Sequence, residues 1–442
     1  MSEKAPSGQV SGLIVAAPSS GSGKTVLTLG LLRALRNRGV RVSSLKIGPD
    51  YIDPAYHAAA TGRPTANLDL WGMRPSTVAG LVDFAGRGAD LVLAEGVMGL
   101  FDGAADGSGS TADAAALTGW PVLLIVDVRG QGASAAAVVR GFRDHRPDVT
   151  IAGIIFNRGG GDKHRTILTN AMQGIDIPIL GFLPRDPTLA VDSRHLGLRQ
   201  AGEHNDLDGW IEASSRIVAA HVDIARIEQL ARPGRSLPGL SNDTVPPLGA
   251  RIAVARDEAF AFSYPHLLTG WEEQGARLSF FSPLADEGPV EIADAVYLPG
   301  GYPELHVGRI AGNTRFLSGL RAAAGRKAAV YGECGGYMVL GRALTDADGK
   351  AHAMAGLLPL DSSFAAPRLH LGYRRLTLAT DCALGVHGAE FRGHEFHYAS
   401  GSADGAAEPL FQASDAQGKS LAAMGCRVGS VSGSFAHLLD RA

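Results

Sequence analysis

The sequence of 442 residues is poor in cysteine, with only Cys334, Cys382 and Cys426. Three widely spaced cysteines, an odd number, give neither a disulfide framework nor a zinc-binding pattern. Their scarcity fits a reducing compartment and leaves at least one thiol as a candidate for chemistry. We interpret Cys382 and Cys426 as ordinary small hydrophobic residues, so the candidate is Cys334.

The sequence also lacks an excess of either charge and any long apolar run. Its 41 basic and 44 acidic residues give a formal net charge of -3, which predicts no basic surface for nucleic acid or an anionic membrane. No apolar stretch approaches the roughly 20 residues that span a bilayer. The early apolar stretch 10–17 has no basic leader and runs into a glycine-rich loop, so we expect a strand and not a signal peptide. We therefore expect a cytoplasmic protein with small-molecule partners.

Length and hydrophobic pattern predict two α/β domains. With 45% hydrophobic residues, the chain is long enough for two cores of about 200 residues each. In the first half, amphipathic stretches alternate with apolar runs at 11–17, 40–46, 90–95, 121–128, 149–157 and 177–183. The pattern restarts in the second half at 250–256, 277–281, 294–301 and 327–333. This alternation predicts parallel sheets in two doubly wound domains, 1–231 and 251–442, with a polar, proline-rich linker at 232–250.

A glycine- and serine-rich loop follows the first predicted strand and ends in Lys24 and Thr25, where a leucine-rich helix is expected. In a phosphate-binding loop, glycine lets backbone N–H groups turn toward phosphate oxygens, lysine neutralises charge, and threonine ligates magnesium. The usual motif has a glycine where this chain has Pro18, so the loop is a variant in which residues 20–22 make the turn. We predict ATP binding by Ser20, Gly21, Ser22, Gly23, Lys24 and Thr25.

Polar residues that follow the predicted strands of the first half are expected beside the bound phosphates. Asp50, Glu95 and Asp102 follow two of these strands, and the carboxyl ends of parallel strands meet at one edge of a sheet. Because hard oxygen ligands suit a divalent ion, we predict a Mg²⁺ site made by Thr25, Asp50 and Glu95. Asn157, at the end of another strand, can read the edge of adenine. A solvated loop position for each acid and a turn-forming role for Asn157 are the alternatives.

Cys334 lies in the sequence GECGG, between a predicted strand and a predicted helix. This is the cysteine form of a nucleophile elbow, in which glycines allow the tight turn and the helix N-terminus lowers the pKa of the thiol. We therefore predict that Cys334 is a nucleophile and that His437 is the base that activates it. Backbone N–H groups of Gly300, Gly301 and Gly335 are expected to form an oxyanion hole. An inert buried thiol and a surface histidine are the alternatives.

His394 and His397, in the sequence HEFH, resemble a metal-binding pair. They lack the i, i+4 spacing of a zinc-binding helix, so a structural or substrate-contact role is favoured. A metal site is the alternative.

Together, the variant phosphate loop and the sequences PDYIDP, EGVMGLFDG, LPGGYPE and GECGGYM resemble the cobyrinic or hydrogenobyrinic acid a,c-diamide synthases of cobalamin biosynthesis. The resemblance covers nearly the whole chain. Its N-terminal half is similar to the ATP-binding fold of dethiobiotin synthetase, and its C-terminal half is similar to a triad-type (class I) glutamine amidotransferase domain. The resemblance implies an enzyme that uses ATP, Mg²⁺ and glutamine to amidate the a- and c-acetates of a corrin precursor. It also implies that Asp50, Tyr51, Glu95 and Asp102 lie near ATP, magnesium and the ring, with Tyr51 and Asp102 as substrate contacts.

The implied chemistry joins two reactions. A carboxylate of the ring attacks the γ-phosphate of ATP to give an acyl phosphate, with Lys24 and Mg²⁺ stabilising the charge. Cys334, activated by His437, forms a thioester with glutamine and releases ammonia for the acyl phosphate. Triad amidotransferases often carry a glutamate two residues after the histidine, where this chain has Leu439. The third triad member is therefore not identified, and a dyad of Cys334 and His437 is an alternative.

Other identities stay open at this point. A cobyric acid synthase-like enzyme and a nickel-sirohydrochlorin diamide synthase are the alternative tetrapyrrole amidotransferases. A non-enzymatic P-loop switch is disfavoured by the intact GECGG sequence. The alanine-, glycine- and arginine-rich composition suggests a GC-rich genome, where the aerobic, cobalt-free route is common, and this favours hydrogenobyrinic acid. The expected partners are the corrin ring, glutamine and ATP, and a homodimer is left open.

Overall fold

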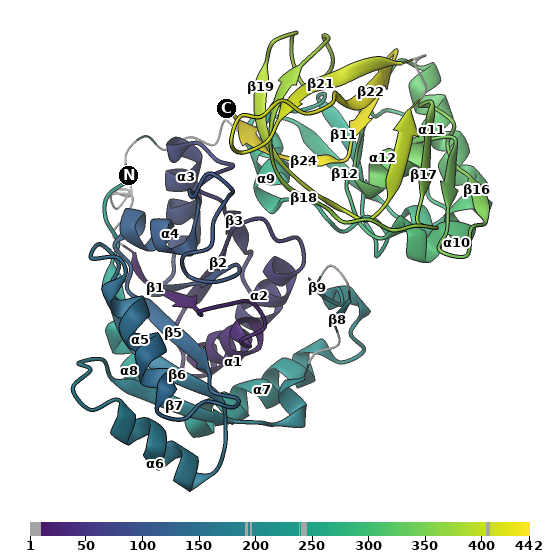
Figure 1. Cartoon of the computed structure of the whole chain (residues 1–442). Helices are drawn as coiled ribbons and strands as arrows, with labels where there is room; N and C mark the ends of the chain where they lie inside the picture. Colours follow the sequence, from purple (N-terminus) through teal and green to yellow (C-terminus); the bar gives the residue numbers. More distant parts are fainter. Residues whose placement is uncertain (1–9, 191–192, 195–196, 238, 240–244, 404–406) are drawn as a thin grey trace. The chain divides into compact units, whose positions relative to one another are not determined.

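The computed structural model describes residues 10–190, 193–194, 197–237, 239, 245–403 and 407–442. The chain divides into two units, which Figure 1 colours along the sequence. The first contains Met1–Trp71 and Pro75–Ser241, and the second contains Gly72–Arg74 and Asn242–Ala442. The division after residue 241 falls within the predicted linker, whose residues 238 and 240–244 lie outside the described residues, as do residues 1–9 of the predicted first domain. The predicted domain bounds therefore remain a prediction.

A parallel sheet forms the centre of the first unit (Figure 1). Its strands are β1 (Ser11–Ala16), β2 (Val42–Ile47), β3 (Ala66–Leu68), β4 (Leu91–Gly96), β5 (Val122–Asp127), β6 (Ile151–Gly159), β7 (Ile179–Pro184) and β10 (Arg232–Pro233). Their order is β3-β2-β4-β1-β5-β6-β7, with every neighbouring pair parallel, and β10 pairs antiparallel with β1. A separate hairpin consists of β8 (Ser193–Arg194) and β9 (Gly197–Leu198). The loops after β1, β2 and β4 consequently meet at one edge of the sheet.

The helices of the first unit are α1 (Lys24–Asn37), α2 (Asp53–Thr61), α3 (Pro75–Gly86), α4 (Thr111–Thr118), α5 (Ser134–Asp144), α6 (Asp162–Ala171), α7 (Leu207–His221) and α8 (Ile224–Leu230), with 3₁₀ turns η1 (Pro187–Leu189) and η2 (Ala201–Glu203). Helix α1 is buried along most of its length and packs against α7. A Cβ on Gly30 would lie 2.5 Å from Val218 Cγ2, so glycine allows the two helices to approach closely. This packing fixes the position of α1, whose first two residues are Lys24 and Thr25.

The second unit contains a ten-stranded mixed sheet and a four-stranded sheet. Its strands are β11 (Arg251–Ala255), β12 (Arg277–Phe281), β13 (Ala295–Leu298), β14 (Ala329–Glu333), β15 (Ala343–Thr345), β16 (Ala351–Ala353), β17 (Leu360–Ser363), β18 (His370–Leu378), β19 (Glu390–His397), β20 (Ser400–Ala403), β21 (Glu408–Ser414), β22 (Met424–Val428), β23 (Val431–Ser434) and β24 (Ala436–Arg441). The larger sheet has the order β12-β11-β13-β14-β23-β22-β21-β18-β19-β24, and its first five strands are parallel. The smaller has the order β16-β15-β17-β20.

The helices of the second unit are α9 (Pro265–Glu273), α10 (Val307–Gly312), α11 (Thr314–Gly325) and α12 (Gly335–Leu340), with 3₁₀ turns η3 (Pro283–Ala285) and η4 (Pro303–His306). Their apolar residues, among them Phe316 and Leu320 of α11, share a buried core with the parallel strands, including Val296 and Val330. Among the described helices of both units, none is long and apolar enough to cross a bilayer.

The predicted strands are present in both units. The apolar runs of the first half coincide with β1, β2, β4, β5, β6 and β7, and those of the second half with β11, β12, β13 and β14. No strand was predicted after residue 333, whereas the described residues beyond α12 contain ten strands, β15 to β24. Much of β18 is partly exposed, which weakens the apolar pattern that marks a strand in the sequence.

Candidate active sites

The predicted phosphate loop lies between β1 and α1. Gly21 and Gly23 have left-handed backbones, with φ of 75° and 86°, which a side chain would strain. Ser22 Oγ donates to the Ser19 carbonyl at 2.8 Å and closes the turn. Because α1 begins at Lys24, its unpaired N–H groups follow the loop directly, as anion binding requires. The turn therefore forms without the glycine of the usual motif.

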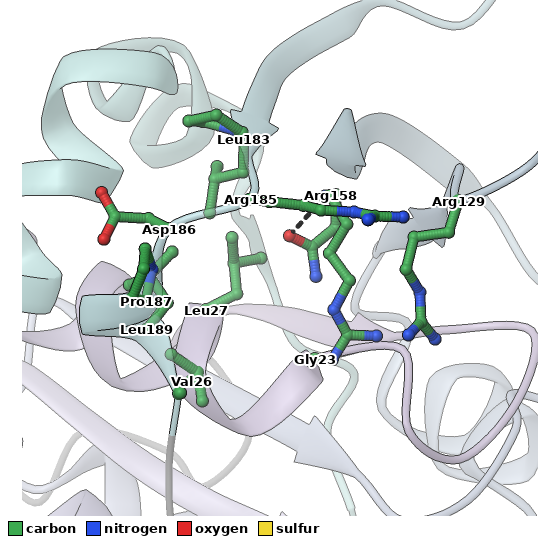
Figure 2. Close-up of a pocket in the computed structure, with 13 residues that line it drawn as sticks. Gly23, Val26, Leu27, Arg129, Arg158, Leu183, Arg185, Asp186, Pro187 and Leu189 are labelled. Atoms are coloured by element: carbon green, nitrogen blue, oxygen red, sulfur yellow. Dashed lines mark hydrogen bonds between the residues drawn. The ribbon is translucent and has the colours of Figure 1, made fainter. Parts of the chain in front are cut away.

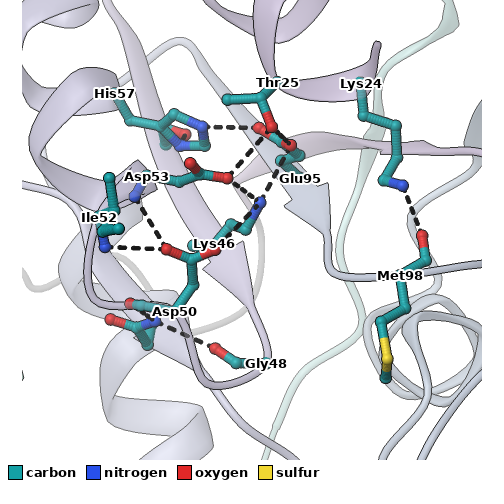
Figure 3. A network of polar contacts seen from close by, with 12 residues as sticks. Lys24, Thr25, Lys46, Gly48, Asp50, Ile52, Asp53, His57, Glu95 and Met98 are labelled. Carbon is teal, nitrogen blue, oxygen red and sulfur yellow. Dashed lines mark hydrogen bonds and ion pairs between the residues drawn. The ribbon is translucent and has the colours of Figure 1, made fainter. Parts of the chain in front are cut away.

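Lys24 is folded back onto this loop and is only 7% exposed. Its ammonium donates to the carbonyls of Ser19, at 3.3 Å, and of Met98, a contact that Figure 3 shows. Burial lowers the pKa of Lys24 to about 8, against the raising effect of Glu95. Neutral carbonyls are weaker partners for an ammonium than phosphate oxygens, so a phosphate can replace them.

Thr25 belongs to a buried network of charged groups (Figure 3). Its Oγ1 lies 2.7 Å from Glu95 Oε1 and 3.1 Å from Asp53 Oδ2. Lys46 Nζ donates to the same two carboxylates, at 2.5 Å to Asp53 and 3.0 Å to Glu95. The sheet explains this meeting, because Lys46 on β2 lies opposite Glu95 on β4. The Asp53 and Glu95 carboxylates thus contact both the Thr25 hydroxyl and one buried cation, the Lys46 ammonium.

Glu95 is held from its other side by His57. His57 Nε2 lies 2.7 Å from Glu95 Oε2, and His57 Nδ1 lies 2.8 Å from Ser44 Oγ, which donates to the Leu93 carbonyl at 2.9 Å. Burial alone would raise the pKa of Glu95, but the charge of Lys46 and the hydrogen bond with His57 outweigh it and lower the pKa. Glu95 is therefore an ionised carboxylate in a fixed orientation.

Asp50 and Asp53 occupy different places. Asp50 Oδ1 accepts the N–H groups of Ile52 and Asp53, both at 2.9 Å, and its Oδ2 lies 3.9 Å from Lys46 Nζ. Asp53 is the carboxylate that contacts Thr25, and burial followed by the charge of Asp50 raises the pKa of Asp53 to about 6. The predicted ligand Asp50 thus lies at the border of the network.

Three members of the network were missed in the sequence. Lys46 ends a strand at the same sheet edge as Glu95, so the argument that identified Glu95 could have found it. Asp53 is the second acid of PDYIDP. His57 lies four residues further, on the same face of α2, whose start the sequence analysis did not predict.

The two predicted substrate residues lie in loops at this edge. Tyr51 is partly exposed in the loop after β2, next to Asp50. Asp102 is exposed in the loop after β4, and its Oδ2 accepts the N–H of Gly99 at 2.8 Å. A Cβ on Gly99 would lie 2.6 Å from the Pro18 carbonyl oxygen, so the Asp102 loop lies against the phosphate loop.

A cavity of about 510 Å³ opens beside the phosphate loop (Figure 2). Asn157 is buried in its wall, where its Nδ2 donates to the Ser22 carbonyl at 2.7 Å and its Oδ1 accepts the N–H of Arg158 at 2.9 Å. Asn157 therefore fastens the loop to β6. Apart from Gly23, the sequence analysis did not identify the rest of the wall, which combines apolar and basic side chains and includes Val26, Leu27, Arg129, Arg158, Leu183, Arg185 and Leu189.

In the second unit, Cys334 forms a sharp turn between β14 and α12. Its backbone has φ 47° and ψ -107°, a conformation that side chains rarely adopt. The neighbouring glycines allow the turn to pack closely. A Cβ on Gly336 would lie 2.0 Å from the Leu298 carbonyl oxygen, and one on Gly332 would lie 2.8 Å from the Gly336 carbonyl carbon. The backbone at Cys334 has the strained turn expected of a nucleophile elbow.

Gly300 lies between Cys334 and His437. A Cβ on Gly300 would lie 2.3 Å from His437 Cε1 and 3.1 Å from Cys334 Cβ, so both side chains border this glycine. Gly301 and Gly335 are also close, because a Cβ on Gly335 would lie 3.1 Å from Gly301 N. The structure thus brings together every residue predicted for the cysteine site.

Cys334 and His437 are both buried, and burial favours the uncharged form of each side chain. Burial, followed by the charge of Glu304, raises the pKa of Cys334 above its ordinary value. Burial, followed by His394 and His397, lowers the pKa of His437 to about 3. The expectation that the helix N-terminus lowers the thiol pKa was wrong, because α12 has only six residues and burial outweighs the neighbouring backbone N–H. The thiolate must therefore form by proton transfer to a base.

The HEFH sequence lies on β19, where His394 is opposite β24. Glu395 binds Arg374 at 2.6 Å and His397 at 2.8 Å. His370 stacks on His397 with ring centroids 4.7 Å apart, and the ligand atoms of His370, Glu395 and His397 lie within 4.8 Å of one another. Because Glu395 and His397 bind each other and Arg374, this geometry supports a structural or substrate-contact role more than a metal site.

Two family models match the chain, one in each half. Residues 13–198 match the CobQ/CobB/MinD/ParA nucleotide binding domain, and residues 251–441 match the CobB/CobQ-like glutamine amidotransferase domain. A nucleotide-binding domain followed by a glutamine amidotransferase domain defines a glutamine-hydrolysing ligase. The predicted fold class and class of enzyme are confirmed.

Known proteins match the chain over nearly its whole length. The hydrogenobyrinate a,c-diamide synthase of Brucella anthropi is 53% identical over 97% of this chain and 98% of its own. The proteins of the same name from Sinorhizobium sp and Mesorhizobium japonicum are 52% and 48% identical, over 98% and 97% of this chain and 99% and 98% of their own. The chain belongs to the hydrogenobyrinate a,c-diamide synthase family. A solved glutamine amidotransferase from Thermotoga maritima is 15% identical over 42% of this chain and 75% of its own, with a TM-score of 0.30, too weak a likeness to add to the argument.

Proposed function

We propose that this chain uses ATP and glutamine to amidate the a- and c-acetate carboxylates of hydrogenobyrinic acid, in cobalamin biosynthesis. The observation that carries the proposal is the presence in one chain of a phosphate loop with Lys24 and Thr25 and of the strained Cys334 turn beside His437. The names of relatives that match 97% or more of the chain support the cobalt-free ring over the cobalt-containing one.

ATP is proposed to bind with its phosphates on the loop and its adenine in the neighbouring cavity. Lys24 would exchange its carbonyl partners for phosphate oxygens. The Asn157 amide bonds the loop with one of its two N–H groups, so a second N–H and a carbonyl lone pair remain for the edge of the base. Apolar side chains such as Leu183 and Leu189 would contact its faces.

A Mg²⁺ ion fits the oxygen ligands around Thr25. Support comes from the Asp53 and Glu95 oxygens, which lie within 3.1 Å of the Thr25 hydroxyl, and from the bonds of both carboxylates to the Lys46 ammonium, which indicate that they favour positive charge. We therefore assign the ion to Thr25, Asp53 and Glu95, with the predicted ligand Asp50 at the border. When bound, Mg²⁺ would neutralise charge on the β- and γ-phosphate oxygens.

Activation of the ring is proposed to occur at the edge that carries Tyr51 and Asp102. A ring carboxylate attacks the γ-phosphorus of ATP, and the bond to the bridging oxygen of ADP breaks, which gives an acyl phosphate and ADP. Lys24 would stabilise the charge of the transferred phosphoryl group. Tyr51 and Asp102 would orient the ring, since both lie in loops beside the phosphate site.

Ammonia is proposed to come from the cysteine site. His437 takes the proton of Cys334, and the thiolate attacks the side-chain amide carbon of glutamine, with N–H groups of Gly301 and Gly335 stabilising the oxyanion. The leaving nitrogen takes the proton and departs as ammonia, and water then hydrolyses the thioester to glutamate. Ammonia attacks the acyl phosphate carbon and releases inorganic phosphate, which completes the amide.

We further propose that the reaction takes place in the cytoplasm, as the cysteine content suggests. The corrin ring, glutamine and ATP are the proposed partners, with no role for nucleic acid or membrane. A homodimer is retained as a candidate assembly.

The test is the Cys334→Ser variant, assayed on hydrogenobyrinic acid with either glutamine or ammonium chloride. We expect amidation with glutamine to be lost and amidation with ammonium to be retained, because only the source of ammonia is removed. Mass spectrometry of the amide products measures both rates.

The matched control is Cys382→Ser, which removes a different free thiol of the same unit. This variant should act as wild type with both nitrogen sources. The proposal fails if the Cys334→Ser variant still amidates with glutamine while its thermal unfolding transition shows that it is folded. It also fails if the wild-type chain amidates none of its ring substrate with either source.

A further inference from the structure

The place of the usual triad glutamate is taken by Leu439, yet a different carboxylate faces the histidine. Glu333, the residue before Cys334, has its Oε2 3.8 Å from His437 Nδ1, and both side chains are buried. We propose that Glu333 is a positioning residue for His437, which orients the ring and stabilises the imidazolium that forms when His437 takes the Cys334 proton. This inference rests on the proposed glutaminase function of Cys334.

The Glu333 carboxylate is fixed by two hydrogen bonds. Its Oε2 accepts the hydroxyl of Tyr297 at 2.7 Å, and its Oε1 accepts the backbone N–H of Leu438 at 3.1 Å. The second bond joins the carboxylate to the residue directly after His437. Glu333 therefore holds the backbone that carries the histidine, while its other oxygen faces the ring.

The topology explains how a residue of β14 comes to face β24. Glu333 lies opposite Ser434 in the parallel pairing of β14 with β23. Only Phe435 separates β23 from β24, so the chain reaches His437 three residues after the partner of Glu333. Because Cys334 directly follows Glu333, the nucleophile, the carboxylate and the histidine lie close together at the end of β14.

The 3.8 Å separation suits a group that acts when the ring gains charge. The resting imidazole is neutral and also bonds the backbone of Phe262. A protonated ring gains a positive charge that attracts an ionised Glu333, and catalytic hydrogen bonds often shorten only once the reaction begins. The proton released by Cys334 would thus be held on a paired imidazolium until glutamine nitrogen takes it.

The surroundings couple the two groups. Burial raises the pKa of Glu333 to about 7, against the lowering effect of its bonds with Tyr297 and Leu438. An ionised Glu333 and a charged His437 therefore stabilise each other in a site where each alone is disfavoured. The other titratable groups that act on this site are Tyr297, Tyr331, His394, His397, Cys334, Glu304 and Glu395.

The first test is Glu333→Gln, which keeps a carbonyl for Leu438 N–H and a polar group for Tyr297 but removes the charge. We expect kcat for glutamine hydrolysis to fall by about 100-fold, because general-base catalysis contributes at least about that factor and His437 would lose the charge that stabilises its protonated form. The KM for glutamine should change little. Amidation with ammonium should match wild type. Glu333→Asp should recover part of the loss, and the exposed Glu273→Gln is the control.

The pH profile separates this role from a structural one. Because only the ionised carboxylate supports the imidazolium, wild-type glutaminase kcat should rise as pH increases through about 7. Glu333→Gln should lose this limb. Tyr297→Phe removes a hydrogen bond that favours the ionised form, so it should move the limb to higher pH while keeping most of the maximal kcat.

The inference is overturned if Glu333→Gln keeps the wild-type kcat and pH profile, or if ammonium-dependent amidation falls as much as glutamine-dependent amidation. If Glu333→Gln does not fold, the Tyr297→Phe profile decides, and an unmoved limb overturns the inference. These results differ from failure of the proposed function, in which Cys334→Ser itself still uses glutamine.

Discussion

Two buried lysines of the first unit differ in their partners. Lys46 binds Asp53 and Glu95, and although burial would lower its pKa, these carboxylates raise it. Lys24 binds only backbone carbonyls in the contacts described, and burial lowers its pKa to about 8. Its charge is thus less fully compensated, which makes Lys24 the ammonium that gains most from a phosphate.

We predict that Lys24→Ala loses amidation with glutamine and with ammonium alike, because phosphoryl transfer precedes both. A lost phosphate contact of roughly 3 to 5 kcal/mol slows turnover by about 10² to 10⁴-fold. Steady-state amidation at saturating ATP with each nitrogen source measures the effect.

The control for this change is Lys163→Ala, an exposed lysine at the start of α6. If Lys24→Ala turns over at a rate close to wild type at saturating ATP, Lys24 does not bind the phosphates of ATP. Glutaminase activity of the cysteine site in the second unit should survive in this variant, and thermal unfolding shows whether the first unit, which carries Lys24, is folded.

At the scale of elements, short apolar runs predicted the parallel strands, because a strand buried on both faces is apolar throughout. The antiparallel strands after α12 were missed, since partly exposed segments such as β18 carry no such apolar run. The glycines of GECGG predicted the turn at Cys334, because the backbone needs them locally.

Side chains that meet only through pairing were harder to predict. Lys46 approaches Glu95 through the register of β2 and β4, and Glu333 approaches His437 through the crossing from β23 to β24. Neither pair has a spacing in the sequence that marks it. The prediction that the pKa of the Cys334 thiol is lowered was wrong for a related reason. Burial raises this pKa, and the whole fold decides how deeply the thiol is buried.

The close approach of Gly300, in the segment that follows β13, to the cysteine site gives an element-scale prediction. A Cβ on Gly300 would lie 2.3 Å from His437 Cε1 and 3.1 Å from Cys334 Cβ, so Gly300→Ala should push the two side chains apart. We expect glutaminase activity to fall by about 100-fold or more, since misplaced catalytic groups lose that much, with ammonium-dependent amidation unchanged.

Gly325→Ala is the matched control, because a Cβ at the end of α11 meets nothing within 4 Å. Thermal unfolding of both variants shows whether they are folded. Full glutamine-dependent activity of Gly300→Ala would mean that Cys334 and His437 do not act as a pair.

At the scale of the whole molecule, the confirmed family and the two domains assign one activation site and one ammonia source to each chain. The sequence contains one phosphate loop, at residues 18–25, with one acidic network beside it. Relatives are named for two amides, a and c, so two rounds of activation must share this site. Each amide should therefore consume one ATP and one glutamine.

The last prediction follows from this sharing. The a- and c-acetates occupy different parts of a rigid ring, so presenting the second carboxylate to the loop at Lys24 requires the ring to turn. Release and rebinding of the monoamide is the simplest route, and the exposed position of Asp102 and the partly exposed Tyr51 suit an open ring site. With substrate in large excess over enzyme, free monoamide should accumulate early and then decline as diamide forms, which mass spectrometry of quenched samples measures. A single-turnover reaction that yields only diamide, with no released monoamide at any time, would show instead that both carboxylates are processed in one binding event.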